Sequence, residues 1–243
     1  MTVLAHFSDL HLDGSPERAD RAGRVVSYLC ALPGALDAVV ITGDLAENGT
    51  AEEYAQLREV LKPLHDRFPV LMCPGNHDVT PVFAEHLAAP QSAAAHGGVQ
   101  ILLVDSSIPG EDDGLLSTST LDWLDARLAA APGTPAVVGF HHPPAALGIP
   151  FIDVIGLRNP AALATVLSRH PQVVAVLAGH AHAAVSTTFA GVPLLVAPGV
   201  VSTAALPWEC ASTWSYQDDW VSLMFHTHTP GGFTTHVRTI SAR

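Results

Sequence analysis

Short apolar runs recur along the first three quarters of the chain and are separated by amphipathic stretches. The apolar runs are residues 3–8, 38–42, 69–73, 135–140 and 173–178. Their length and apolar content predict buried strands.

Helical patterns occupy most of the segments between these runs. The predicted helices are residues 17–31, 51–67, 120–131 and 160–170. The second begins with a capping box, in which Thr50 is followed three residues later by Glu53. The fourth begins with Asn159 as its N-cap and Pro160 in its first turn. The alternation of strands and helices predicts a layered α/β fold.

The last third of the chain changes to a strand–turn–strand pattern. Two hairpins are predicted, which pair residues 185–189 with 192–196 and residues 221–227 with 233–240. Ala190-Gly191 and Pro230-Gly231-Gly232 supply the turns. This pattern predicts a second, more antiparallel sheet that packs on the first. Because no repeat, low-complexity tract or linker divides the chain, we expect residues 1–243 to form a single domain.

Composition and charge narrow the class of protein. The chain has 243 residues, 48% of them hydrophobic, which is enough for one sizeable core or at most two small domains. Its net charge of -12 argues against a nucleic-acid polymer as partner, because such partners require a basic surface. Cys30, Cys73 and Cys210 show no paired spacing, which favours a reduced intracellular setting. With neither a signal peptide nor an apolar run of membrane-spanning length, a cytoplasmic location without a membrane partner is expected.

Polar motifs follow the ends of five predicted strands. They are Asp9-Leu10-His11, Gly43-Asp44, Gly75-Asn76-His77-Asp78, His141-His142-Pro143 and Gly179-His180-Ala181-His182. In open α/β sheets the carboxyl ends of the strands are where functional sites are built. The five motifs are therefore expected to meet at one site.

These motifs offer the ligands of two metal ions. Four histidines, two aspartates and one asparagine make a mixed nitrogen and oxygen donor set, which suits Mn, Fe or Zn. Two such ions, roughly 3.5–4 Å apart, can produce a hydroxide near neutral pH and clamp a phosphoryl group. Asp44 can bridge the two ions, and His77 directly follows a ligand, so His77 can face the substrate and protonate the leaving oxygen. The residues predict a two-metal hydrolase.

The series D-x-H, G-D, G-N-H-D, H-H-P-P and G-H-x-H resembles the calcineurin-like metallophosphoesterases, and within them the bacterial class III cyclic nucleotide phosphodiesterases. Residues 42–45, 104–110, 121–124 and 141–198 add to the likeness, which covers roughly the first 200 residues. The tail from about Val201 does not contribute to it. The resemblance implies an α/β fold in the form of a four-layer α/β/β/α sandwich, with two mixed sheets flanked by helices.

The resemblance also implies a role for each motif residue. One metal ion would be held by Asp9, His11, Asp44 and His182, and the other by Asp44, Asn76, His141 and His180. His77 and Asp44 would be the catalytic residues. The expected cofactors are two divalent or trivalent ions of Mn, Fe or Zn, with an Fe/Mn pair preferred. The implied activity is hydrolysis of small phosphodiesters, with 3′,5′-cyclic nucleotides such as cAMP as the leading substrates.

Several other residues have a structural and a functional interpretation. His142 is expected to support the ligands from behind or to line the pocket, and Asp78 to orient the His77 loop by hydrogen bonding. His6 is interpreted as a core histidine. His226 and His228 are interpreted as part of a solvated strand face, with an extra metal site as the alternative. Arg158 is expected to form a salt bridge more readily than to meet a phosphate.

Other functions and surfaces remain open at this point. The same metals could serve a glycerophosphodiesterase, a nucleotide pyrophosphatase or a phosphomonoesterase, including a protein phosphatase. A non-catalytic scaffold is a further alternative, which loss of a ligand or of His77 would have favoured. The loop of residues 143–158, with Phe151, Ile152 and Ile155, is expected to form part of the pocket wall. The apolar residues 192–206 suggest a homodimer face from composition alone.

Overall fold

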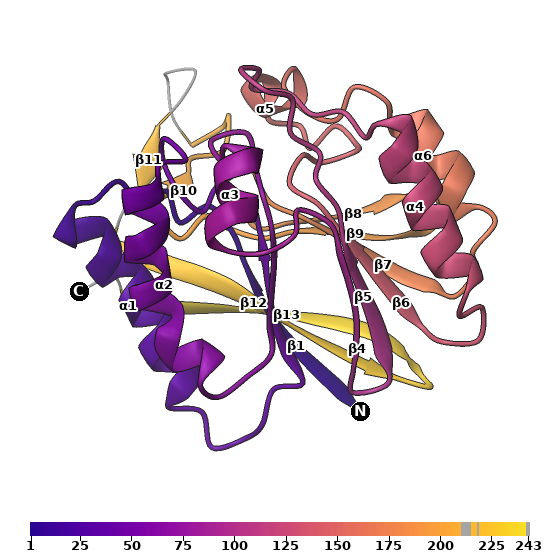
Figure 1. The fold of residues 1–243 in the computed structure, drawn as a ribbon, viewed down its shortest axis with the longest axis horizontal. Coiled ribbons are helices and arrows are strands. Elements are labelled where there is room, and N and C mark those ends of the chain that lie inside the picture. Colours follow the sequence, from indigo (N-terminus) through magenta and orange to yellow (C-terminus); the bar gives the residue numbers. More distant parts are fainter. Residues whose placement is uncertain (210–214, 218, 242–243) are drawn as a thin grey trace.

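Two large sheets lie face to face between two groups of helices (Figure 1). The computed structural model describes residues 1–209, 215–217 and 219–241, so Cys210 lies outside the described residues. The first sheet has the order β13-β12-β1-β2-β3. Its strands are β1 (Thr2–Phe7), β2 (Ala38–Thr42), β3 (Val70–Cys73), β12 (Trp220–Thr229) and β13 (Gly232–Ser241).

The second sheet has the order β4-β5-β6-β7-β9-β8. Its strands are β4 (Ser92–His96), β5 (Val99–Leu103), β6 (Ala136–Gly139), β7 (Val173–Ala178), β8 (Val185–Phe189) and β9 (Val192–Val196). A short pair, β10 (Thr203–Ala204) and β11 (Tyr216–Gln217), stands apart from both sheets. Within the described residues each large sheet contains both parallel and antiparallel pairs, as the family resemblance implied.

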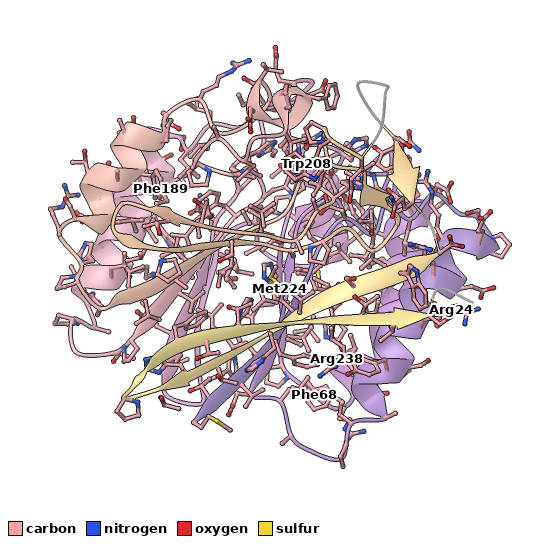
Figure 2. All side chains as sticks on the ribbon, turned by 180° about the vertical axis from the view of Figure 1, so that it is seen from behind. Arg24, Phe68, Phe189, Trp208, Met224 and Arg238 are labelled. Carbon is pink, nitrogen blue, oxygen red and sulfur yellow. The ribbon has the colours of Figure 1, made fainter. Side chains whose placement is uncertain are left out.

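Helices cover the outer face of each sheet. On the first sheet lie α1 (Pro16–Cys30), α2 (Ala51–His65) and α3 (Thr80–His86), and on the second lie α4 (Thr118–Ala129) and α6 (Pro160–Leu167). The short α5 (Pro150–Asp153) packs on the same core as α4 and α6 but stands beyond the ends of the strands. A third apolar layer, which includes Leu4, Val40, Leu177 and Met224, is buried between the sheets. Figure 2 shows Met224 near the centre of the molecule. The predicted four-layer α/β/β/α sandwich is confirmed.

The late hairpins do not form a sheet of their own, so that prediction is wrong. The hairpin β8–β9 joins the second sheet through the parallel pair β7–β9. The hairpin β12–β13 extends the first sheet, because β12 pairs antiparallel with β1 along Thr2–His6. The reason is that β2 pairs with only one edge of β1, which leaves the other edge open for a further strand. β12 fits there because it carries apolar residues on both of its faces.

Most predicted elements appear with ends shifted by a few residues. The structure adds α3, α5 and the strands β4, β5, β10 and β11. β4 has the sequence SAAAH, which has little intrinsic strand preference, and it forms by pairing with β5. The capping box of Thr50 and Glu53 is confirmed. Asn159 is the N-cap residue of α6, but its side chain makes no cap hydrogen bond and instead bonds the backbone of Leu116 in both directions, at 3.1 and 2.8 Å.

The apolar segment 192–206 is turned inward. Leu194, Val196, Ala197 and Val200 are at most 1% exposed. Its composition therefore reflects the chain's own core and gives no support for a dimer face, and dimerisation itself stays a prediction. Among the described residues, every helix is too short or too polar to cross a bilayer.

Candidate metal centre

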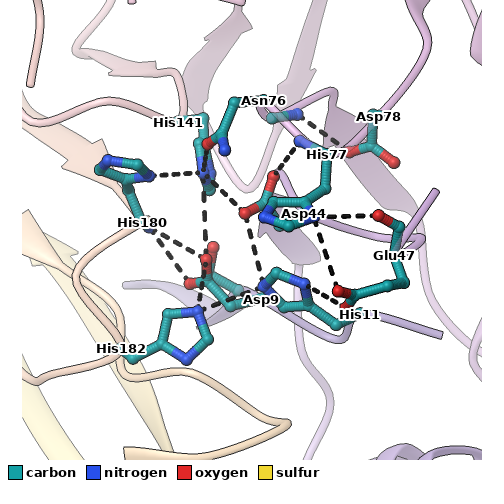
Figure 3. A network of polar contacts seen from close by, with 12 residues as sticks. Asp9, His11, Asp44, Glu47, Asn76, His77, Asp78, His141, His180 and His182 are labelled. Atoms are coloured by element: carbon teal, nitrogen blue, oxygen red, sulfur yellow. Dashed lines mark hydrogen bonds and ion pairs between the residues drawn. The ribbon is translucent and has the colours of Figure 1, made fainter. Parts of the chain in front are cut away.

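The seven predicted metal ligands lie together just beyond the carboxyl ends of strands from both sheets (Figure 3). Asp9 and His11 follow β1, Asp44 follows β2, Asn76 follows β3, His141 follows β6, and His180 and His182 follow β7. All seven are buried or partly buried. The fold thus brings together every ligand position that the sequence predicted.

The backbone at this site is locally strained. Among the described residues outside glycine, a left-handed φ occurs at Asp9 (57°), His11 (48°), Asp44 (50°), His180 (72°), His182 (49°) and Ala190 (50°). Ala190 lies in a hairpin turn, whereas the other five are among the seven predicted ligands. Such a conformation costs on the order of 1–3 kcal/mol per residue, and it concentrates at functional sites. These five residues follow β1, β2 and β7, where the backbone turns sharply and directs the side chains of the motifs to one centre.

Two glycines allow the motif loops to approach closely. A Cβ atom on Gly75 would collide with the carboxylate of Asp44, and one on Gly43 would collide with the ring of His141. Gly43 also has a φ of +88°, which favours glycine. These positions explain why glycine precedes Asp44 and Asn76 in the motifs.

Asp9, His11 and His182 form the first group of ligand atoms. The Nε2 atom of His11 lies 3.2 Å from Nε2 of His182 and 3.4 Å from Oδ2 of Asp44. The Nε2 atom of His182 lies 3.6 Å from Oδ1 of Asp9.

His141 is the centre of the second group. Its Nε2 atom lies 3.1 Å from Oδ1 of Asn76, 3.2 Å from Nδ1 of His180 and 3.2 Å from Oδ2 of Asp44. The same carboxylate oxygen of Asp44 therefore faces both groups, and a ligand shared by two metal ions would lie in this position.

The hydrogen bonds behind the rings direct lone pairs into the centre. Nδ1 of His141 donates to the carbonyl oxygen of Thr42 at 2.7 Å, so in the neutral ring Nε2 carries the lone pair. Nδ1 of His11 donates to the carboxylate of Glu47 at 3.0 Å, with the same consequence for its Nε2. Lone pairs and carboxylate oxygens that converge in this way repel one another unless a cation lies between them. The donor set therefore fits a pair of metal ions.

Burial and charge act on the same groups. Burial raises the pKa of Asp9 to about 6, although the nearby His141 opposes that shift. Burial acts to lower the pKa of His141, but the Asp44 carboxylate overrides it and raises that pKa to about 9. Burial lowers the pKa of both His180 and His182 to about 3, which keeps these rings neutral and able to bind a metal. The buried carboxylates of Asp9 and Asp44 are thus stabilised by a positive charge close to them, and a bound metal ion supplies that charge.

Sequence reasoning missed the residues that support the ligands from behind. Glu47 binds His11, and its carboxylate is in turn held by Arg18, whose guanidinium also contacts Asp13 at 3.3 Å. The hydroxyl of Ser202 lies 3.0 Å from Nδ1 of His182. Glu47 could have been noticed because it follows Asp44 by three positions in the same loop. For Ser202 the sequence carries no such signal.

His77 sits at the rim of the centre. Its backbone amide donates to Oδ1 of Asp44 at 3.0 Å, and its Nδ1 donates to the carbonyl oxygen of Glu47 at 2.9 Å. Nε2 is then the ring nitrogen left to exchange a proton with a bound molecule. Asp78 organises this loop, as predicted, since its carboxylate accepts from the amides of Leu45, Ala46 and Gly75 and from the hydroxyl of Tyr54.

His142 and Arg158 both make contacts with other side chains of the protein. The His142 ring is buried, lies 4.9 Å from the ring of His141 and 4.8 Å from that of His180 between centroids, and has Nδ1 2.8 Å from the hydroxyl of Ser106. It supports two ligand rings, one of the two roles expected of it. Arg158 forms ion pairs with Glu111 and Asp113, which confirms the predicted salt bridge.

The prediction of a solvated face is wrong for His226. His226 is fully buried, and its Nε2 lies 3.1 Å from Nδ1 of His6. His6 is a core histidine, as predicted, with Nε2 2.9 Å from the hydroxyl of Thr42. The reason is the pairing of β12 with β1, which places His226 inside the sandwich. His228, further along the strand, is partly buried.

A cleft of about 760 Å³ opens over the centre. Its floor includes His11, Asp44, Asn76, His77, His180 and His182. Phe151, Ile152 and Ile155 line one side, which confirms the predicted pocket wall, and Val201 and Tyr216 also line the cleft. Arg18 and Arg21 are the basic residues that line it among the described residues.

Comparison with known proteins agrees with this geometry. Residues 2–184 match the model of the calcineurin-like phosphoesterase family. The chain is 34% identical over 221 residues to a glycerophosphodiester phosphodiesterase of Enterobacter lignolyticus, covering 82% of this chain and 77% of that protein. It is 34% identical over 220 residues to a cAMP/cGMP dual specificity phosphodiesterase of Mycobacterium tuberculosis, covering 84% and 69%.

The fold has a close counterpart among solved structures. A dimetal phosphatase from Danio rerio superposes with a TM-score of 0.68 at 16% identity, over 100% of this chain and 99% of that one. The family match, the relatives and the groups of residues able to hold a metal ion point to one conclusion. The chain belongs to the calcineurin-like phosphoesterase family and is a metal-dependent phosphodiester hydrolase.

Proposed function

We propose that this protein is a binuclear phosphodiesterase that hydrolyses small phosphodiesters, with 3′,5′-cyclic nucleotides such as cAMP as its substrates. The convergence of ring lone pairs and carboxylate oxygens on two adjacent groups is the observation that carries the proposal. One group comprises Asp9, His11, Asp44 and His182, and the other comprises Asp44, Asn76, His141 and His180. The nitrogen and oxygen donors favour Mn, Fe or Zn, and we propose an Fe/Mn pair.

Metal ions bound there would supply a hydroxide near neutral pH and neutralise charge on the phosphoryl group. The protein's own residues hold that arrangement in place. Asp44 presents one carboxylate oxygen to both groups, while its other oxygen accepts from the amide of His77. This hydrogen bond ties the position of His77 to that of the bridging ligand. His77, half-exposed in the cleft, then donates a proton from Nε2 to the leaving oxygen.

The charges of the cleft favour a diester over a monoester. A phosphodiester carries one negative charge, whereas a phosphomonoester carries about two near neutral pH and needs a further cation. The guanidinium of Arg18 is already bound by Asp13 and Glu47, and that of Arg21 donates to the carbonyl oxygens of Val200 and Trp220. Both basic residues of the described cleft are thus engaged in holding the protein together. A scaffold without activity is disfavoured, because all ligand positions and His77 are present.

A glycerophosphodiester is the second candidate substrate. It rests on the 34% identity to the glycerophosphodiester phosphodiesterase of Enterobacter lignolyticus. Both candidates share the reaction at phosphorus and differ only in the groups attached to it.

The first test compares bis-p-nitrophenyl phosphate with p-nitrophenyl phosphate as substrates of the Mn-loaded protein. We expect turnover mainly of the diester, and loss of at least about a thousandfold in kcat in Asp44→Ala, since both metal groups share this residue. Asp112→Ala, which removes a carboxylate from the same cleft but outside both groups, is the matched control. Faster turnover of the monoester than of the diester would show that the protein is a phosphatase. Absence of turnover of both substrates in folded, metal-loaded protein would refute the proposal. Hydrolysis of cAMP and of glycerophosphoethanolamine then separates the two substrate classes.

A further inference from the structure

Two exposed aromatic side chains line the cleft above the metal centre. Phe151 is 51% exposed and Tyr216 is 48% exposed. The large apolar side chains exposed in the described residues also include Met1, Val79, Leu115, Val154, Trp208, Trp220 and Val237, but none of these lines the cleft. Exposed aromatic rings beside a reaction centre are typical of surfaces that bind a ligand, because their faces offer contact area at little entropic cost.

Tyr216 is fixed close to the metal ligands. Its ring centroid lies 5.6 Å from that of His182, with an angle of 51° between the planes. The β10–β11 pair sets Tyr216 opposite Ala204, and the amide of Ala204 donates to the carbonyl oxygen of His182 at 2.8 Å. A group attached to a phosphoryl group at the centre therefore comes within reach of the Tyr216 ring.

Phe151 lies on a segment that several hydrogen bonds hold in place. It belongs to α5, where the carboxylate of Asp153 accepts from the amides of Leu147 and Gly148. Downstream of α5, the amide of Gly114 donates to Gly156 and the amide of Leu157 donates to Pro143. Figure 1 shows α5 and the β10–β11 pair at the same end of the molecule, on different segments of the chain. The cleft is thus bordered by two aromatic side chains, each on a segment that hydrogen bonds of its neighbouring residues hold in place.

We infer that Phe151 and Tyr216 form a subsite for the planar aromatic part of the substrate, the nucleobase of a cyclic nucleotide. This inference rests on the proposed phosphodiesterase function and specifies which diesters the site selects. Stacking of a base on an aromatic side chain tolerates any base, because every base has a π-face. A glycerol group has no such face and gains nothing from the rings. The subsite therefore favours nucleotide diesters over glycerophosphodiesters and discriminates little between adenine and guanine.

The test is the kinetics of full-length, Mn-loaded protein with 3′,5′-cAMP and with glycerophosphoethanolamine. For Tyr216→Ala and Phe151→Ala we expect kcat/KM for cAMP to fall roughly tenfold. The fall should come from a higher KM at nearly unchanged kcat. Both kcat and KM for glycerophosphoethanolamine should stay unchanged. Tyr216→Phe keeps the ring and should match the parent protein. Val154→Ala is the matched control, because Val154 directly follows α5 and is exposed outside the cleft.

The outcomes separate the subsite from the proposed function. Equal losses on both diesters would assign the two residues to general folding of the cleft and overturn the subsite. Unchanged kinetics in both alanine variants would overturn it as well. Turnover of glycerophosphoethanolamine without turnover of cAMP or bis-p-nitrophenyl phosphate would overturn the subsite and leave a metal-dependent diesterase. Failure of the parent protein on every diester would instead refute the proposed function.

Discussion

Single residues behind the metal ligands decide how the ligands are presented, and Glu47 is the clearest example. Its carboxylate holds Nδ1 of His11, its backbone carbonyl holds Nδ1 of His77, and Arg18 holds the carboxylate in turn. Arg18 and His11 together lower the pKa of Glu47 to about 2, with the hydrogen bond from His11 as the larger cause. Glu47 is thus ionised near neutral pH.

We expect Glu47→Ala to weaken metal binding by about 10–100-fold, because the His11 ring loses the partner that sets its tautomer and orientation. Titration of the metal-free protein with Mn, followed by calorimetry and by activity, measures this change. Glu47→Gln keeps a hydrogen-bond acceptor, so its affinity for Mn should lie between that of the parent protein and that of Glu47→Ala. Glu52→Ala, which changes an exposed acid on α2, is the control. An affinity in Glu47→Ala equal to that of the parent protein would contradict the role assigned to Glu47.

At the scale of elements, the sequence pattern was sufficient to predict the hairpin β12–β13 but not the strand with which it pairs. Two strand-like runs around Pro230-Gly231 predicted the hairpin correctly, since turn and alternation are local properties. The partner of the hairpin is β1, more than two hundred residues away along the chain. Nothing local distinguishes that pairing from a separate sheet. The burial of His226 against His6 follows from the pairing, and it reverses the interpretation of His226 as solvated.

This pairing predicts a pH-dependent stability. Burial lowers the pKa of His226 from 6.5 to about 3, so in the folded protein the ring stays neutral over this range. The unfolded chain binds a proton below pH 6.5, and the stability that His226 confers, complete above pH 6.5, is therefore lost as the pH falls toward 3.

Replacing His226 by Gln should reduce the slope of unfolding free energy against pH by up to about 1.4 kcal/mol per pH unit between pH 5 and 6. Urea unfolding of metal-free protein at several pH values measures the slope. His228→Gln, on the same strand, serves as control. If His226→Gln keeps the slope of the parent protein, His226 does not titrate as described.

At the scale of the whole molecule, the two ends of the chain depend on each other. β12 and β13 complete the sheet that begins with β1, and residues that follow strands of both sheets make up the proposed metal centre. We therefore propose that residues 1–243 fold as a single domain.

This proposal predicts one cooperative unfolding transition, with the same midpoint by far-UV circular dichroism and by tryptophan fluorescence. Trp123 lies on the side of the second sheet and Trp220 in the first, so the fluorescence reports on both. Free Mn at 100 times its dissociation constant should raise the unfolding free energy by about 2.7 kcal/mol per site, and Asp44→Ala should abolish this increase. Two separate transitions, or a metal effect on only one part, would contradict a single domain.

The sequence by itself determined most of the strands and helices, the layered class of the fold and the seven residues that we propose as metal ligands. These features are local: periodicity, turn residues and short motifs at strand ends are written in adjacent residues. The tertiary structure alone decided that β12 pairs with β1, that His226 is buried, and that Glu47 and Ser202 stand behind His11 and His182. It also decided that Tyr216 lies beside His182. These contacts join residues that are distant along the chain or separated by a turn, and only the packing of the two sheets brings them together.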